Sequence, residues 1–177
     1  MDYLWTPWRY QYLTSLHKPS TCIFCAMAQT PDHDEETLVV FRGAHNFIVL
    51  NRFPYTSGHL MVVPYQHASD LAGIAEATAI ELMALTREAE RHLKWLYHPD
   101  GINLGMNIGE SAGAGIAGHI HMHVLPRWSG DSNFMTVVGE TRVLGEVLPV
   151  TWQRMKEAFA RPPEGPGARP SEDAPAS

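Results

Sequence analysis

Residues 118–128 read GHIHMHVLPRW and place three histidines, His119, His121 and His123, one apolar residue apart. A period of two is the period of a β-strand, so this spacing predicts a strand over 119–126 with the three imidazoles on one face. Near neutral pH an imidazole can donate, accept, attack as a nucleophile or bind a metal. A histidine-rich polar surface is the simplest alternative, but titratable groups in such a cluster more often form a site. The row therefore predicts either a metal site or a nucleophile with flanking helper groups.

The flanking sequence predicts the rest of an α+β domain. Stretches rich in β-branched and aromatic residues predict four further strands, at 37–43, 45–51, 59–64 and 102–109. Apolar residues recur at helical spacing from Ser69 to Tyr97, with Gly73 as a break near the start and Pro99 just after the end. Strands, then one long helix, then strands predict a five-stranded antiparallel sheet.

Composition divides the chain into four parts. An aromatic N-terminal arm (1–21) precedes the central domain (22–135), and an extension (136–160) carries a predicted helix at 149–160. The tail (161–177) is rich in Pro, Gly and Ser, which predicts disorder. Within the central domain we expect a turn or short helix at 22–29, a polar loop at 30–36 and a glycine-rich loop at 109–118.

Charge and hydropathy exclude several classes of function. The net charge is −6 with no basic block, which argues against a nucleic-acid surface but not against a small nucleotide. No apolar run is long enough to span a bilayer, and the N-terminus lacks the continuous apolar core of a secretory signal. Two cysteines do not make a disulfide framework. We therefore expect a cytoplasmic protein with no membrane partner.

The segment HIHMHVL resembles the motif of the histidine triad (HIT) family of nucleotide hydrolases and transferases. Asn51 lies eight residues before His59, and Asn107 lies twelve before His119, which is similar to the same family. The likeness runs from about Cys22 to Arg127. The flanking segments LWTPWR (4–9) and PRWSGDSNF (126–134) look more particularly like the bacterial diadenosine tetraphosphate phosphorylases of this family.

This resemblance implies a reaction at the α-phosphate of an adenine nucleotide or dinucleoside polyphosphate. His121 would be the nucleophile and would form a covalent nucleotidyl-histidine, while His123 and His59 would contact phosphate oxygens and the leaving group. Diadenosine tetraphosphate would be cleaved by inorganic phosphate to ADP and ATP. The family also implies a homodimer in which the sheet continues across two chains.

Several other functions stay open at this point. Water as the acceptor would make the protein a dinucleoside polyphosphate hydrolase, and a different leaving group would make it a nucleoside phosphoramidate hydrolase. All three triad histidines on a catalytic zinc would make a metallohydrolase, but no Asp- or Glu-bearing motif beside the row supplies its base. A nucleotide-binding protein without turnover is the remaining alternative.

The resemblance also implies the groups that bind the substrate. Asn51 would bind the ribose, Asn107 the α-phosphate or the bridging oxygen, and Arg127 a second phosphate or base. The further expected contacts, to the base and to the phosphates, are Ile23, Phe24, Ser111, Gly113 and Trp128. Simpler interpretations are a turn for Asn107 and a surface ion pair for Arg127.

One position departs from the family pattern. Many members carry Gln and then Ser or Thr where this chain has Gly115 and Ile116. The hydroxyl that usually touches the leaving group is therefore missing. Ser111 or backbone N–H groups are the possible substitutes, and the preference for a leaving group is open.

Cys22 and Cys25 form a CxxC pair that suggests zinc. A structural zinc site needs four ligands, and His67 and His119 are the candidates for the other two, as in the zinc-bearing branch of the HIT family. Two buried thiols or a redox pair are the alternatives. With zinc bound, the three histidines of the row would not share one role: His119 would anchor the metal while His121 attacks.

Overall fold

The computed structural model describes residues 22–131 and 144–161. The predicted N-terminal arm, the boundary expected at residue 135 and all but Arg161 of the predicted tail lie outside these residues. In chain order the elements are α2 (Ile23–Ala28), η1 (Pro31–His33), α3 (Asp34–Thr37), β1 (Val39–Arg42), β2 (Asn46–Leu50), β3 (Leu60–Pro64), η2 (Leu71–Gly73), α4 (Glu76–Tyr97), β4 (Gly101–Gly105), η3 (Glu110–Ala112), β5 (Met122–Arg127) and α6 (Leu148–Ala160).

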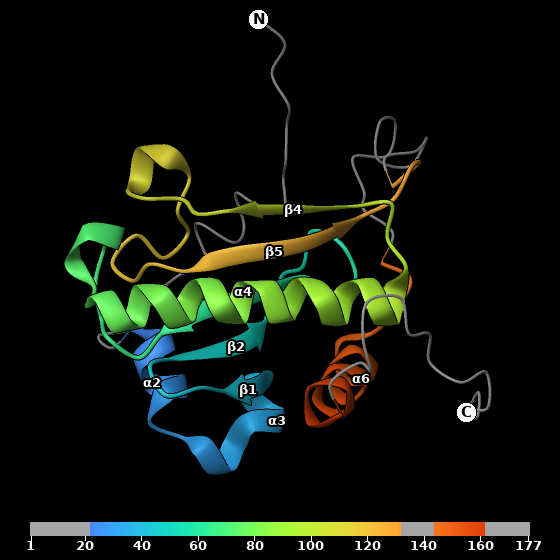
Figure 1. The fold of residues 1–177 in the computed structure, drawn as a ribbon, viewed down its shortest axis with the longest axis horizontal. Coiled ribbons are helices and arrows are strands. Elements are labelled where there is room, and N and C mark those ends of the chain that lie inside the picture. The colour runs from blue at the N-terminus through green and yellow to red at the C-terminus, as the bar shows by residue number, and fades with distance from the viewer. Residues whose placement is uncertain (1–21, 132–143, 162–177) are drawn as a thin grey trace, which may run out of the picture.

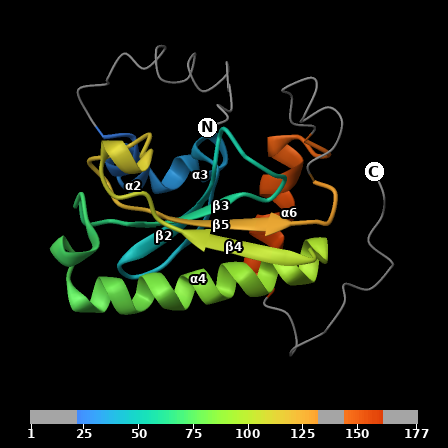
Figure 2. The same ribbon diagram turned by 90° about the horizontal axis from the view of Figure 1, so that it is seen from above.

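The strands form one five-stranded antiparallel sheet in the order β1-β2-β3-β5-β4. This confirms the predicted α+β fold with one long helix and a C-terminal helix. Helix α4 covers one face of the sheet, and α2 lies on the opposite face (Figures 1 and 2). Helix α6 packs against the edge strand β1 and against α4. Every residue of β2 and β3 is buried, so both faces of these central strands are covered. The core includes residues of α4 on one face and Phe24 of α2 on the other.

Strand β5 begins later than the histidine spacing predicts. Its ladder with β3 starts at the pair Val62 and Met122, so the strand prediction was wrong for residues 119–121. Pro64, the last residue of β3, has no N–H to offer a ladder, and its carbonyl accepts from the Nε2 of His119 instead. Ordinary pairing therefore stops before His121, and the N–H of Ile120 bonds to the carbonyl of Ala68 beyond β3.

The helix boundaries follow the expected signals in most places. A break falls at Gly73, where η2 ends before α4 begins, and α4 ends at His98 in a left-handed conformation (φ 45°) just before Pro99. The predicted polar loop at 30–36 was wrong, because it contains η1 and most of α3. Pro31 suits the first turn of η1, and α3 starts with three acidic residues that favour a helix N-terminus.

Arg42 anchors α2 to the sheet. Its guanidinium donates to the carbonyl of Met27 at 2.8 Å, near the end of α2, and forms an ion pair with Asp34 at 2.8 Å. A cation is favourable at the carbonyl end of a helix. Lys156 of α6 reaches the same carboxylate at 3.1 Å. These contacts hold the helix that carries Cys25 in a defined place over the sheet.

Glu146 ties α6 to the end of α4. Its carboxylate accepts from the hydroxyls of Tyr97 and Thr151 and from Arg154, at 2.6–2.7 Å. The Tyr97 ring in turn packs against Gly58, whose φ of 79° and close neighbours leave little room for a side chain. The C-terminal helix thus supports the loop that leads into His59. Among the described residues, no helix combines the length and the apolar character needed to cross a membrane.

Candidate active site and metal centre

Three histidines meet on the α2 face of the sheet. His59 lies just before β3, His121 just before β5, and His123 in β5 opposite Met61. The Nε2 of His59 is 2.9 Å from the Nδ1 of His123, and the ring centroids of His121 and His123 are 4.7 Å apart. His59 has no exposed surface and His121 is 5% exposed. The structure therefore brings together the three predicted catalytic side chains.

The His121 ring is held in one tautomer. Its Nδ1 lies 2.9 Å from the backbone carbonyl oxygen of His119, which can only accept, so Nδ1 carries the proton. The unprotonated nitrogen is then Nε2. Burial lowers the pKa of His121 despite the opposing hydrogen bond to the carbonyl, which favours the neutral ring at pH 7. A neutral imidazole with a fixed lone pair is the form that a nucleophile requires.

His123 is neutral at pH 7 as well. Burial, and next the charge of His121, lower its pKa to about 4. A neutral histidine has a single N–H, so the nitrogen that carries it decides what the ring can do. Because the Nδ1 of His123 contacts His59, the position of the His123 proton depends on the hydrogen bonds that His59 makes.

The residues predicted to contact base and ribose lie beside these histidines. Phe24 is 1% exposed, and its ring packs against those of His119 and His121 at centroid distances of 5.4 and 5.1 Å. Its neighbour Ile23 is 39% exposed. The amide of Asn51 lies 3.3 Å from the Nδ1 of His59, so this side chain joins the histidine cluster directly.

The predicted phosphate loop follows β4. Asn107 lies between β4 and η3, and Ser111 is in η3, a short helix where a plain loop was expected. Gly109 and Gly113 adopt φ values of 84° and 88°, a backbone region that side chains rarely enter. Glycine is therefore required at these two positions whether or not a phosphate binds.

Arg127 is the last residue of β5, and Trp128 follows it. Arg127 forms a bidentate ion pair with Asp131 and also donates to Asn103 at 2.8 Å, so the simpler interpretation of an ion pair applies in this conformation. The Trp128 ring meets that of Tyr97 edge to face at 6.4 Å, at the end of α4. Both residues have protein partners in this conformation, and their contact with a substrate stays a prediction.

Two groups of this site were missed in the sequence. The Tyr55 ring lies 5.0 Å from the His59 ring, and its backbone N–H points at the Nδ1 of His59 from 3.3 Å. The signal that the sequence offers for Tyr55 is that an aromatic residue lies between Asn51 and His59. The Pro64 carbonyl that holds His119 is a backbone atom, and its role carries no mark in the sequence.

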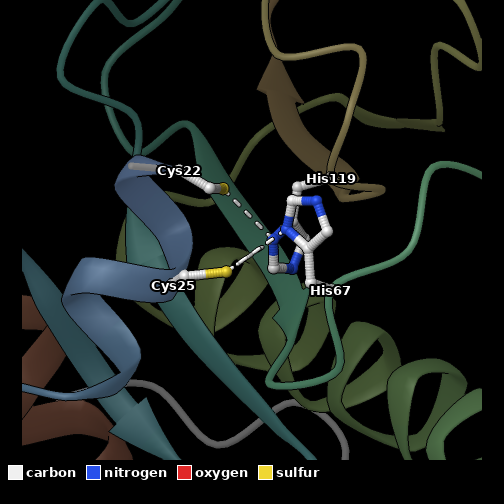
Figure 3. A group of neighbouring side chains, drawn as sticks. All are labelled: Cys22, Cys25, His67 and His119. Atoms are coloured by element: carbon white, nitrogen blue, oxygen red, sulfur yellow. Dashed lines mark hydrogen bonds between the residues drawn. The ribbon is translucent and has the colours of Figure 1, made fainter. Parts of the chain in front are cut away.

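A second cluster lies a few residues away, where α2 faces the end of β3 (Figure 3). It brings together Cys22, Cys25, His67 and His119, whose ligand atoms all lie within 4.8 Å of one another. The Sγ of Cys22 is 3.3 Å from the Nδ1 of His119, and the Sγ of Cys25 is 3.3 Å from the Nδ1 of His67. The predicted four-residue cluster is confirmed.

The donor set and its spacing fit zinc. Bond lengths of about 2.3 Å to sulfur and about 2.0 Å to nitrogen put tetrahedral ligand atoms about 3.3–3.8 Å apart. His119 directs Nε2 at the Pro64 carbonyl at 2.9 Å, so its Nδ1 offers a lone pair to the thiols. Burial, and next the hydrogen bond and charge of Cys22, raise the pKa of Cys25, so two thiolates here need a cation. Zinc bound here would tie α2 to the sheet.

Comparison with known protein sequences identifies the family of this chain. A sequence model described as the HIT domain matches residues 33–130. The chain is 43% identical over 166 residues to a Mycobacterium tuberculosis protein named AP-4-A phosphorylase, covering 90% of this chain and 85% of that one. It is also 34% identical over 114 residues to an uncharacterized HIT-like protein of Saccharolobus solfataricus, covering 64% of this chain and 79% of that one.

Solved structures agree with the sequence relatives. A Zn-bound histidine triad family protein from Mycobacterium smegmatis superposes with a TM-score of 0.64 and 27% identity, covering 79% of this chain and 94% of that one. A hypothetical histidine triad nucleotide-binding protein from Sulfolobus tokodaii gives a TM-score of 0.63 and 26% identity, covering 78% and 92%. The triad motif, the fold and these relatives agree, and the chain belongs to the histidine triad (HIT) family.

Proposed function

We propose that this protein is a nucleotidyl transferase that cleaves diadenosine tetraphosphate with inorganic phosphate, yielding ADP and ATP. The observation that carries the proposal is the tautomer of His121: its Nδ1 proton is held by the His119 carbonyl, which leaves a lone pair on a buried Nε2. Similarity to a protein named AP-4-A phosphorylase over 90% of the chain supports this choice of substrate.

The reaction proceeds in two displacements. The Nε2 of His121 forms a bond to the α-phosphorus, the bond from that phosphorus to its bridging oxygen breaks, and ATP leaves. An oxygen of inorganic phosphate then attacks the adenylyl-histidine, the N–P bond breaks, and ADP leaves with His121 restored. Dividing one difficult displacement into two easier ones is the advantage of covalent catalysis. His123 lies beside the nucleophile, where an N–H donor would stabilise the charge that develops on the phosphate oxygens, and His59 contacts His123.

Product analysis tests the proposal. Diadenosine tetraphosphate is incubated with the protein, with and without inorganic phosphate, and the nucleotides are separated. We expect ADP and ATP in equal amounts, formed only when phosphate is present. AMP and ATP regardless of phosphate would make the protein a hydrolase. No product in either tube would reject this substrate, and AMP-linked phosphoramidates would be tested next.

We further propose that Cys22, Cys25, His67 and His119 hold a structural zinc ion. The ligand spacing and donor set support this, as does the resemblance to a Zn-bound member of the family. Metal analysis of the purified protein tests it, and we expect close to one zinc per chain. Metal-replete protein without zinc would reject the proposal.

A homodimer that continues the sheet is also proposed. Strand β4 is an edge of the sheet, and its Leu104 is 49% exposed. Helix α4 exposes Ile80 (65%) and Met83 (50%), two apolar positions that the helical pattern would otherwise assign to the core. Light scattering should give the dimer mass, and Leu104→Arg should shift the population toward monomer. A wild-type monomer at micromolar concentration would reject the dimer. The cytoplasmic location stays a prediction.

A further inference from the structure

The loop between β2 and β3 closes on the back of His59. The N–H of Phe53 donates to the Oδ1 of Asn51 at 3.0 Å, which fixes the orientation of that amide. The Nδ2 group of Asn51 therefore faces the Nδ1 of His59, at 3.3 Å. The backbone N–H of Tyr55 points at the same nitrogen from 3.3 Å. Two donors converge on one ring nitrogen, so that nitrogen must be an acceptor.

This arrangement determines where the protons of two histidines lie. With Nδ1 of His59 accepting, the ring carries its proton on Nε2 and donates it to the Nδ1 of His123 at 2.9 Å. The Nδ1 of His123 is then an acceptor in turn, and the single N–H of a neutral His123 is on its Nε2. A chain of three hydrogen bonds thus runs from the Phe53 backbone through Asn51 and His59 to His123.

We propose that Asn51 is a positioning residue that sets the tautomers of His59 and His123, so that His123 offers an Nε2–H to the phosphate attacked by His121. The role of that N–H rests on the proposed function, whereas the tautomers are a property of the protein alone. The resemblance to the HIT family implies a ribose contact for Asn51. The second hydrogen of its Nδ2 can still make one, so the two roles are compatible.

An amide is required at this position because a carboxylate would reverse the order of donors. In Asn51→Asp the side chain has nearly the same shape but can only accept. The His59 proton would then move to Nδ1 to meet the carboxylate, because a hydrogen bond to a charged oxygen outweighs the 3.3 Å contact from the Tyr55 N–H. The Nε2 of His59 would become an acceptor facing His123. The Nδ1 of His123 would have to donate, and its Nε2 would lose the hydrogen that the proposed reaction uses.

Nitrogen-15 NMR of the histidine rings in the full-length, zinc-loaded protein tests the tautomers without any substrate. In the wild type we expect a protonated Nε2 and an unprotonated Nδ1 in both His59 and His123. Asn51→Asp should invert both rings. The matched control Gln153→Glu makes the same change of amide to carboxylate on the exposed side of α6, where its partner is Glu157, and should leave both rings unchanged. A wild-type His59 with its proton on Nδ1 would overturn the proposal even if the variant failed to fold.

Kinetics with diadenosine tetraphosphate separate positioning from ribose binding. In Asn51→Asp, the phosphate should lose the hydrogen bond from the Nε2–H of His123. Loss of this one donor should lower kcat about 100-fold with little change in KM. A higher KM with unchanged kcat and unchanged tautomers would show that Asn51 acts only as a ribose contact, and would also overturn the proposal. Because the spectra need no nucleotide, failure of the proposed substrate would not be confused with failure of the tautomer assignment.

Discussion

His119 and His121 are two residues apart, yet they belong to different sites. His119 turns its Nδ1 toward the two cysteines and gives its Nε2 to the Pro64 carbonyl. His121 does the reverse: its Nδ1 donates to the His119 carbonyl, which leaves Nε2 for the reaction. One residue type thus provides both the proposed metal ligand and the proposed nucleophile. The difference comes from which backbone carbonyl takes the ring proton, since each carbonyl selects one tautomer.

The largest expected effect comes from removing the nucleophile. His121→Ala should lower phosphorolysis at least about 1,000-fold and should abolish the covalent adenylate, because alanine lacks the ring nitrogen that would attack the phosphorus. Acid-quenched incubation with radiolabelled substrate measures the adduct. Zinc content should be unchanged, which would separate the two sites. Adenylate still bound covalently in this variant would reject His121 as the nucleophile.

Removing a metal ligand should instead cost the protein its zinc while leaving the proposed nucleophile in place. Cys22→Ser should lose zinc and, with it, the stability that zinc binding contributes, which is about 4 kcal/mol when free zinc is 1,000 times its Kd. Denaturant unfolding with and without a chelator measures this free energy. The chelator should lower the stability of the wild type but not of the variant. If chelation left the wild type equally stable, the cluster would not be a structural zinc site.

The low pKa of His123 should make stability depend on pH. Its pKa is about 4 in the folded protein against 6.5 as the ordinary value. Between these values the unfolded chain binds the proton and the folded protein does not, so the free energy of unfolding falls as pH drops from 6.5 to 4. At about 1.4 kcal/mol per pKa unit, the loss amounts to about 3 kcal/mol.

His123→Asn isolates this contribution from those of the metal ligands, which also release zinc in acid. The variant should lose less stability than the wild type over the same pH range, measured by urea unfolding at each pH. Equal losses in both proteins would show that His123 titrates normally in the folded state.

The smallest expected effect comes from the side chain that both sites share. Phe24 packs against His119 and His121, and Phe24→Leu keeps the site apolar while removing both ring contacts. We expect a loss of about 1 kcal/mol in the free energy of unfolding. A loss of zinc without a loss of activity, or the reverse, would show that the two sites depend on this ring unequally.

Much of the fold was predictable because its signals are local. The apolar stretches and the histidine alternation predicted five strands, and the order of strands and helix predicted their antiparallel arrangement. Gly73 marked a real break before α4. The strand prediction was wrong at His119 and His121, where local alternation continued but the pairing strand had ended at Pro64. The prediction of a loop at 30–36 was wrong because η1 and α3, of 3 and 4 residues, are too short to show a helical repeat in the sequence.

The sequence alone was enough to identify the family and to predict most of the elements in their order. It also predicted which side chains would carry the chemistry, because residue types and their spacing can be read directly from the chain. The tertiary structure was needed to show which partners each histidine meets and which of its ring nitrogens holds the proton. His67 is 42 residues from Cys25, and His59 is 64 residues from His123, so these contacts depend on the strand order. Besides the Asn51 amide, three backbone groups determine where the histidine rings carry their protons: the carbonyl of Pro64, the carbonyl of His119 and the N–H of Tyr55. Every residue but proline has both of these backbone groups, so only the folded chain shows which of them reach a histidine ring.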